Sequence, residues 1–306
     1  MARIVFMGTP DYAKTILASI WSPQDTYLVI TKPDMPVGRR QVMTPSPVSR
    51  WAEEQGLAVL KPMRLADIRL DLEAFDPDYI LTAAFGRILR PWLIELPRFG
   101  AYNLHASLLP RWRGPNPVAW AIRSLDETTG VTLMQMDAGI DTGPIVAQTS
   151  VAIHGADTVA TLTERLSRVA AELWRDTLEQ RGPGSLEAVP QPLCGATAAP
   201  KFRLEDAHLD FGKPVRQVDS QLRSATPDPG AWALWGALRV KVLAAEVAGD
   251  QASDDPGYVL WEGRDWLVAC NPGLLRIRLI HPEGRRPMQP GDFMRGQHGV
   301  STGHLR

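Results

Sequence analysis

Residues 3–20 read RIVFMGTPDYAKTILASI and decide how the fold begins. Four consecutive apolar residues, at positions 4–7, predict a buried strand. Gly8 and Pro10 then mark a turn, and the apolar spacing that follows predicts an amphipathic helix. A buried strand, a short turn and a helix open a βα unit, so this stretch already favours an α/β protein.

The alternation of strands and helices continues up to about residue 180. TYLVITKPD at 26–34 and YILTAAFGRIL at 79–89 each predict a strand that runs into a loop. Between them, SPVSRWAEEQG predicts a helix with Ser46 as its N-cap and Pro47 in its first turn. We therefore expect a doubly wound, mostly parallel, Rossmann-like sheet, with functional residues in loops at the carboxyl ends of its strands.

A change of composition marks a second domain. Residues 181–200 read RGPGSLEAVPQPLCGATAAP, which is the composition of a linker. Beyond it, short strand-like runs such as GYVLWEG and DWLVAC are separated by Gly/Pro turns, a pattern that favours a small C-terminal β-barrel. We expect a catalytic domain over residues 1–186, a linker over 187–203 and the barrel over 204–306.

Composition narrows the class of protein. Of 306 residues, 44% are hydrophobic and 22% charged, and the net charge is −1, as in ordinary soluble globular proteins. No apolar run approaches the roughly 20 residues of a membrane span. Cys194 and Cys270 stand far apart, so we expect neither a disulfide framework nor a metal site, and a cytoplasmic setting. GxxxxGK[ST], GxGxxG, HExxH and GxSxG motifs are all absent.

The stretch AYNLHASLLPRWRGPNP at 101–117 carries polar residues where a buried strand is expected. In a strand, Asn103, His105 and Ser107 share one face, and a buried amide, imidazole and hydroxyl are costly unless each is hydrogen-bonded or used. Two interpretations remain open on this stretch alone: a histidine satisfied in the core, or a row of functional side chains.

A second segment favours function. GVTLMQMDAGIDTGPI at 130–145 predicts a strand and a glycine-rich loop with Asp137 and Asp141. Asp141 follows His105 by 36 residues, about one βαβ crossover, so two adjacent strands could bring the carboxylate to the imidazole at their carboxyl ends. A plain turn aspartate is the alternative. Together, an amide, an imidazole and a carboxylate suit acyl transfer.

These residues resemble a known family. FMGTPDYA, TKPDMPVGRRQVMTPSPV, AFGRIL, YNLHASLLPRWRG, TGVTLMQMDAGIDTG and GATAAPKFRLEDAHLDF are similar, in order and interval, to segments of the methionyl-tRNA formyltransferases. The pair Asn-x-His-x-Ser-x-Leu-Pro and Asp-x-Gly-x-Asp-x-Gly is typical of the wider group that takes its formyl group from 10-formyltetrahydrofolate. The resemblance implies a monomeric, metal-free enzyme that formylates initiator methionyl-tRNA for translation initiation.

The resemblance also implies roles for single residues. Asn103, His105 and Asp141 would be catalytic. The folate would be bound by Ser107, Leu108, Leu109, Pro110, Arg87, Ile88, Leu89, Asp137, Gly139 and Ile140. The tRNA would be contacted by the barrel and by Arg39, Arg40, Arg111, Trp112 and Arg113. One departure keeps an alternative open: GPNPVAW at 114–120, with Trp120, is similar to sugar-nucleotide N-formyltransferases that use the same donor.

Overall fold

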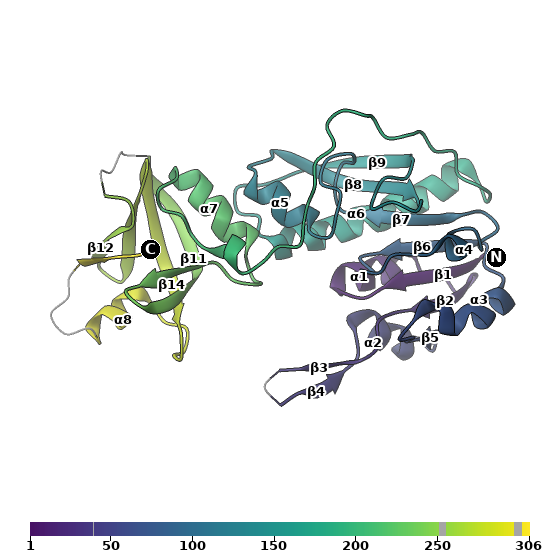
Figure 1. Ribbon diagram of the computed structural model, residues 1–306, viewed down its shortest axis with the longest axis horizontal. Coiled ribbons are helices and arrows are strands. Elements are labelled where there is room, and N and C mark those ends of the chain that lie inside the picture. Colours follow the sequence, from purple (N-terminus) through teal and green to yellow (C-terminus); the bar gives the residue numbers. More distant parts are fainter. Residues whose placement is uncertain (39, 251–254, 297–301) are drawn as a thin grey trace. The chain divides into compact units, whose positions relative to one another are not determined.

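The computed structural model describes residues 1–38, 40–250, 255–296 and 302–306 (Figure 1). Two compact units can be distinguished in it. The first comprises Met1–Pro117, Thr128–Ala152 and Thr163–Pro200. The second comprises Val118–Glu127, Ile153–Leu162 and Lys201–Arg306. Within the described ranges, every helix is too short or too polar to cross a bilayer.

A seven-stranded sheet of order β5-β2-β1-β6-β7-β8-β9 forms the frame of the first unit. Its strands are β1 (Arg3–Gly8), β2 (Thr26–Ile30), β5 (Ala58–Leu60), β6 (Tyr79–Ala83), β7 (Ala101–His105), β8 (Thr128–Gln135) and β9 (Ile145–Ala152). Neighbours from β5 to β7 run parallel, whereas β8 and β9 are antiparallel additions at one edge. The predicted mostly parallel sheet is therefore confirmed.

Helices cover both faces of this sheet, as a doubly wound fold requires. They are α1 (Asp11–Ile20), α2 (Pro47–Glu54), the 3-10 turn Leu65–Ile68, α3 (Arg69–Phe75), α4 (Pro91–Ile94) and α6 (Val159–Arg181). Val5 and Met7 of β1 pack in a cluster with Leu72 of α3 and Leu93 of α4. Ile4 and Phe6, whose side chains alternate with these, are buried as well. Because both faces are covered, β1 has the continuous apolar run seen in the sequence.

Two predicted local features explain the start of helices. A Cβ atom added at Gly8 would lie 2.5 Å from the Cβ of Ala13, so glycine lets α1 pack closely against the end of β1. Ser46 is the N-cap of α2, because its hydroxyl accepts a hydrogen bond from the Ser49 amide at 3.0 Å, and Pro47 lies in the first turn. The predicted cap is confirmed.

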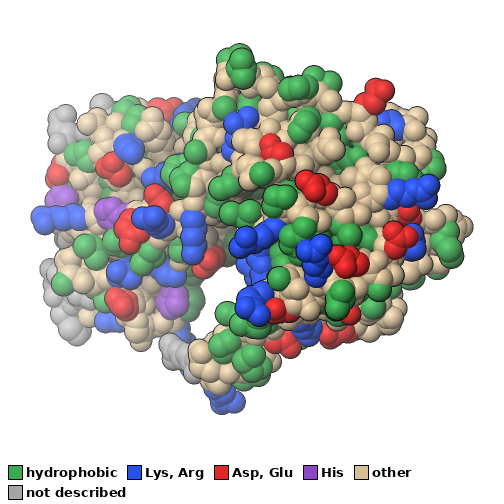
Figure 2. Space-filling view, turned by 45° about the vertical axis from the view of Figure 1, so that its right-hand side comes forward, with side chains coloured by type: hydrophobic (Ala, Val, Ile, Leu, Met, Phe, Trp, Pro, Cys, Tyr) green, Lys and Arg blue, Asp and Glu red, His purple; other side chains and the backbone are tan. Residues whose placement is uncertain are grey.

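The loop between β2 and α2 contains a hairpin that sequence periodicity missed. Strands β3 (Met35–Val37) and β4 (Val42–Thr44) pair in antiparallel register. Their apolar side chains are unusually exposed: Met35, Val37, Val42 and Met43 are each more than half accessible. Figure 2 shows green hydrophobic side chains on this projecting hairpin. Three-residue strands are too short for an alternating pattern to be recognised.

The second unit is a β-barrel, as predicted. Its six strands lie in the order β10-β11-β14-β13-β12-β15, all antiparallel. They are β10 (Trp232–Trp235), β11 (Leu238–Gly249), β12 (Tyr258–Glu262), β13 (Asp265–Cys270), β14 (Gly273–Pro282) and β15 (Thr302–His304). Leu234 and Arg306 exchange backbone hydrogen bonds of 2.6 and 2.9 Å, which join the first strand to the chain end and close the sheet.

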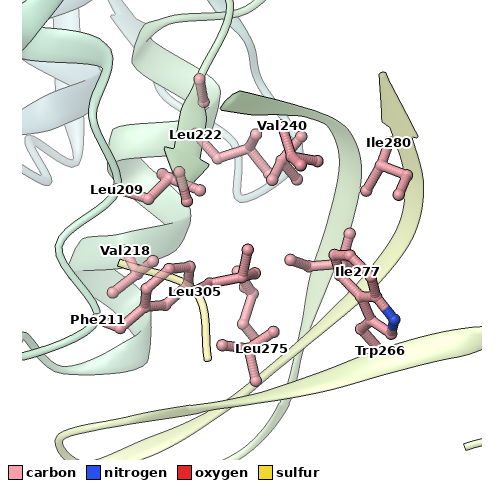
Figure 3. Close-up of a cluster of buried hydrophobic side chains, with 14 of the residues drawn as sticks. Leu209, Phe211, Val218, Leu222, Val240, Trp266, Leu275, Ile277, Ile280 and Leu305 are labelled. Carbon is pink, nitrogen blue, oxygen red and sulfur yellow. The ribbon is translucent and has the colours of Figure 1, made fainter. Parts of the chain in front are cut away.

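The barrel core is apolar and is covered by helices α7 (Val215–Ser224) and α8 (Pro290–Arg295). Short helices α5 (Pro117–Arg123) and the 3-10 turn Glu205–Ala207 precede it in the chain. In Figure 3, Val218 and Leu222 of α7 point toward the barrel strands. Trp266 is fully buried and stacks on Trp235 with ring centroids 5.0 Å apart. The second unit thus has a hydrophobic core of its own.

Candidate functional site

Asn103 and His105 lie on the same face of β7, at its carboxyl end. Asn103 pairs in register with Thr82 of the neighbouring parallel strand β6. The Thr82 hydroxyl donates a hydrogen bond to Asn103 Oδ1 at 2.8 Å. Because the amide oxygen is engaged in this way, the amide NH₂ of Asn103 is the end available to an acceptor. The amide is therefore oriented as a hydrogen-bond donor.

The imidazole of His105 is only 7% exposed, and both of its nitrogens face oxygen atoms. Nε2 lies 2.9 Å from the carbonyl oxygen of Trp112, which can only accept a hydrogen bond, so Nε2 carries a proton. Nδ1 lies 3.6 Å from Oδ1 of Asp141. A carboxylate at this distance orients the ring and stabilises its protonated form.

Asp141 reaches His105 by a different route from the one predicted. The expected crossover between two parallel strands is wrong, because β8 runs antiparallel to β7 and pairs Tyr102 with Gln135 and His105 with Thr132. The carboxyl end of β8 therefore lies beside the start of β7, about 10 Å along the strand from His105. The loop of residues 136–144 folds back over this distance and brings Asp141 to the imidazole.

The Asp141 loop is held by its own polar groups. Asp141 has a left-handed backbone with φ of 52°, which is rare for a residue other than glycine. Its Oδ2 accepts a hydrogen bond from the Gly114 amide at 2.8 Å. Earlier in the loop, the Asp137 carboxylate accepts hydrogen bonds from the Gly139 amide and the Thr142 hydroxyl. The loop is thus fixed from both ends.

Ser107 lies outside the strand, since β7 ends at His105. It is fully buried, and its hydroxyl donates to the carbonyl oxygen of Arg111 at 2.7 Å. The Thr132 hydroxyl of β8 donates to the Ser107 carbonyl at 2.6 Å and accepts from the Leu109 amide at 3.0 Å. Residues 107–111 therefore form a braced turn, and Ser107 stabilises that turn rather than continuing the polar row of β7.

The predicted folate residues differ in accessibility. Ile88 is 71% exposed and Ile140 is 62% exposed, whereas Leu89 is buried in the core and Leu109 is 3% exposed. Leu108 and Pro110 are half-buried. The Arg87 guanidinium donates to the Pro62 carbonyl at 2.9 Å, which ties the loop after β6 to the segment after β5. Ile88 and Ile140 are the accessible apolar side chains of the set.

The predicted tRNA residues have varied environments. Arg39 lies outside the described residues, and Arg40 is exposed in the turn of the β3/β4 hairpin. The Arg111 guanidinium lies over the Trp112 ring, 4.3 Å from its centroid. The Arg113 guanidinium donates through Nε and Nη2 to Oε1 of Gln191, at 3.1 and 2.6 Å.

Sequence reasoning missed three residues that support the site. Thr82 could have been noticed as a lone hydroxyl in the apolar run YILTA. Thr132 and Gln148 could not, because polar residues are common on edge strands. The Gln148 amide donates to the Leu109 carbonyl and to the Thr132 hydroxyl, at 2.9 and 2.8 Å. No three His, Cys, Asp or Glu side chains in the described ranges are grouped so as to hold a metal ion.

A buried tyrosine supports β7 from below the site. The Tyr12 hydroxyl of α1 donates to the Leu104 carbonyl at 3.3 Å. Complete burial raises the pKa of Tyr12 far above its ordinary value, so the phenol remains a neutral donor. Taken together, the site offers an oriented amide donor, a protonated Nε2 and a carboxylate beside the ring. This set can stabilise a tetrahedral oxyanion formed by attack on a carbonyl.

Comparisons with known proteins agree with this chemistry. The family described as formyl transferase matches residues 2–178, and its C-terminal domain matches residues 201–298. The chain is 41% identical to the methionyl-tRNA formyltransferase of Myxococcus xanthus over 304 residues, which cover 98% of this chain and 96% of the relative. It is also 41% identical to that of Paracoccus denitrificans, over 96% and 97% of the two chains.

A solved structure gives the same fold at lower identity. The N-formyltransferase of Helicobacter canadensis, in complex with folinic acid and dTDP-3-aminofucose, superposes with a TM-score of 0.69. It is 19% identical, and the superposition covers 90% of this chain and 98% of that one. At this level of identity the likeness concerns the fold.

Proposed function

The chain belongs to the methionyl-tRNA formyltransferase family, and from this premise we propose that it transfers the formyl group of 10-formyltetrahydrofolate to the α-amino group of initiator methionyl-tRNA. The carrying observation is the convergence of Asn103, His105 and Asp141 at the end of β7, in a chain 41% identical to such enzymes over nearly its whole length. The sugar-nucleotide alternative is not favoured, because the sugar enzyme is only 19% identical.

The reaction needs little help to expose its nucleophile. An α-amino group has a reference pKa of about 8, so a substantial neutral fraction exists near neutral pH. Its nitrogen attacks the formyl carbon, and the carbonyl oxygen becomes an oxyanion. Collapse of this intermediate breaks the bond between the formyl carbon and N10, and the proton lost by the amine passes to N10. The products are the formylated amine and tetrahydrofolate.

We assign the charge stabilisation to the residues of β7. The NH₂ of Asn103 donates to the oxyanion, since Thr82 occupies the amide oxygen. His105 donates through Nε2, exchanging its hydrogen bond with the Trp112 carbonyl for one with the substrate, and it relays the proton toward N10. Asp141 keeps the ring oriented from the Nδ1 side.

We propose that the folate lies between the loop after β6 and the Asp141 loop. Ile88 and Ile140 support this placement, because their exposed side chains provide apolar contact for an aromatic ring system. Arg87 and Asp137 support the loops from which these side chains project. The folinic acid bound by the Helicobacter canadensis enzyme is consistent with a formyl-folate donor.

We assign tRNA binding to the hairpin β3/β4 and to the second unit. On the barrel, Arg276 pairs with Glu262 and Asp265, and Arg278 pairs with Glu246. These pairs leave little positive charge on that part of the barrel for phosphates. Other basic residues, such as the exposed Arg40, therefore have to supply the contacts. Affinity for tRNA should fall steeply between low and high salt, and an unchanged affinity would contradict these contacts.

Formylation of charged initiator tRNA, separated on acid-urea gels, tests the function directly. Asn103→Ala, His105→Ala and Asp141→Asn should each lose about 100-fold or more in rate, the usual effect of removing an oxyanion donor or its support. Circular dichroism of each variant confirms folding. Wild-type rates in any two variants would refute the trio. Formylation of an amino-sugar nucleotide in place of the tRNA would refute the acceptor. We also infer a cytoplasmic monomer, which light scattering tests.

A further inference from the structure

The segment that follows α6 is more than a tether. We define the connector as residues 187–200. Its backbone pairs with the first unit at two places: Val189 exchanges hydrogen bonds of 2.8 Å with Ile145, and the Arg113 amide donates to the Thr197 carbonyl at 2.9 Å. The Thr197 hydroxyl also accepts from the Trp112 amide. The connector is therefore anchored on both sides of Gln191.

The carboxamide of Gln191 has its full complement of hydrogen bonds. Its Nε2 donates to the backbone carbonyls of Asp141 and Gly143, both at 2.8 Å. Its Oε1 accepts from Nε and Nη2 of Arg113. Two donors and two acceptor positions are all that a carboxamide possesses. Such a side chain, held by paired backbone on either side, fixes whatever it contacts.

What Gln191 fixes is a strained part of the site. Asp141 has the left-handed backbone described above, which persists in a residue with a side chain only where the surroundings determine it. On the side-chain end, the Gly114 amide binds Oδ2 of Asp141. On the backbone end, Gln191 binds its carbonyl. Without Gln191, only the Gly114 contact opposes relaxation of the backbone, and Oδ1 moves away from His105.

We propose that Gln191 is a positioning residue for formyl transfer, which holds Asp141 beside His105 and ties this loop through Arg113 to the segment after β7. The proposal rests on the proposed function for its kinetic part only. Arg113 then acts inside the site through Gln191, in addition to any contact with tRNA. The connector contributes to catalysis although it carries no reacting group.

Two variants separate the possible roles of this side chain. Gln191→Glu keeps the size and the acceptor for Arg113 but replaces both N–H donors with an oxygen that repels the two carbonyls. Gln191→Ala removes all four hydrogen bonds. Leu193→Ala is the matched control, because Leu193 lies two residues along the connector and its side chain is fully exposed.

Steady-state formylation is the first measurement. Both Gln191 variants should lose about 10- to 100-fold in kcat, the scale of a misplaced catalytic group, with KM for folate and tRNA near wild type. Leu193→Ala should match wild type. Wild-type kcat in Gln191→Glu would overturn the proposal, since only the Arg113 contact would then matter. A raised KM for folate with unchanged kcat would also overturn it, because the connector would then support the donor.

Amide hydrogen exchange is the second measurement, and it does not depend on the reaction. The Gly114 amide, which donates to Asp141, should exchange faster in both Gln191 variants than in wild type and in Leu193→Ala. Equal protection in all four proteins would overturn the proposal. If the wild-type protein formylates no tRNA, the proposed function fails, while the exchange result still decides whether Gln191 holds the Asp141 loop.

Discussion

Replacing Thr82 with valine removes one hydroxyl from the site and leaves the shape of the side chain nearly unchanged. The lost contact is the 2.8 Å hydrogen bond to Asn103 Oδ1. A hydrogen bond of this kind contributes about 0.5–1.5 kcal/mol net. If its effect is to select the orientation of the Asn103 amide, the same energy appears in the transition state. We therefore expect kcat/KM for formylation to fall about 2- to 12-fold.

A matched control and a double mutant make this prediction specific. Thr129 of β8 is also buried, and its hydroxyl has no hydrogen-bond partner within the described part of the chain, so Thr129→Val should keep the wild-type rate. In an Asn103→Ala background, Thr82→Val should cause no further loss, because the amide it orients is gone. Equal losses from Thr82→Val in the two backgrounds would refute the proposed role, as would a wild-type rate in the single variant.

Three further predictions concern stability and reactivity. Trp266→Ala should destabilise the barrel by about 3–5 kcal/mol in guanidinium unfolding, whereas Trp266→Phe should cost clearly less, since it removes a buried indole N–H without a partner among the described residues. Ser46→Ala should cost about 1 kcal/mol through loss of the α2 cap, and an unchanged midpoint would contradict that. Burial raises the pKa of Cys270 from 9.0 to about 12, so a thiol reagent at pH 8 should modify Cys194 alone in the native protein and both cysteines after unfolding. For the same reason, Cys270 should cost stability as the pH rises from about 9 toward 12, because only the unfolded thiol ionises there.

Much of the fold could be read from local pattern. The apolar run of β1 required a strand covered on both faces, and Ser46 with Pro47 marked the start of α2. The barrel followed from short strand-like runs between Gly and Pro. These signals are local because strand burial and helix capping depend on neighbouring residues. The β3/β4 hairpin escaped notice, since strands of three residues give no usable period.

The candidate site divides along the same line. Asn103 and His105 are two residues apart in one strand, so their common face followed from strand geometry. The approach of Asp141 was anticipated, but the route was wrong: sequence spacing does not distinguish a parallel crossover from an antiparallel neighbour with a loop that folds back. Ser107 seemed to extend the polar row until the end of β7 at His105 placed it in a turn.

By itself, the sequence determined the class of fold, the two domains' character and the side chains available for chemistry, because each depends on residues close together in the chain. Only the tertiary structure decided how those side chains are held. Thr82 meets Asn103 across 21 residues, and Gln191 meets Asp141 across 50. Such contacts depend on strand register and on the path of a connector, and neither leaves a periodic trace in the sequence.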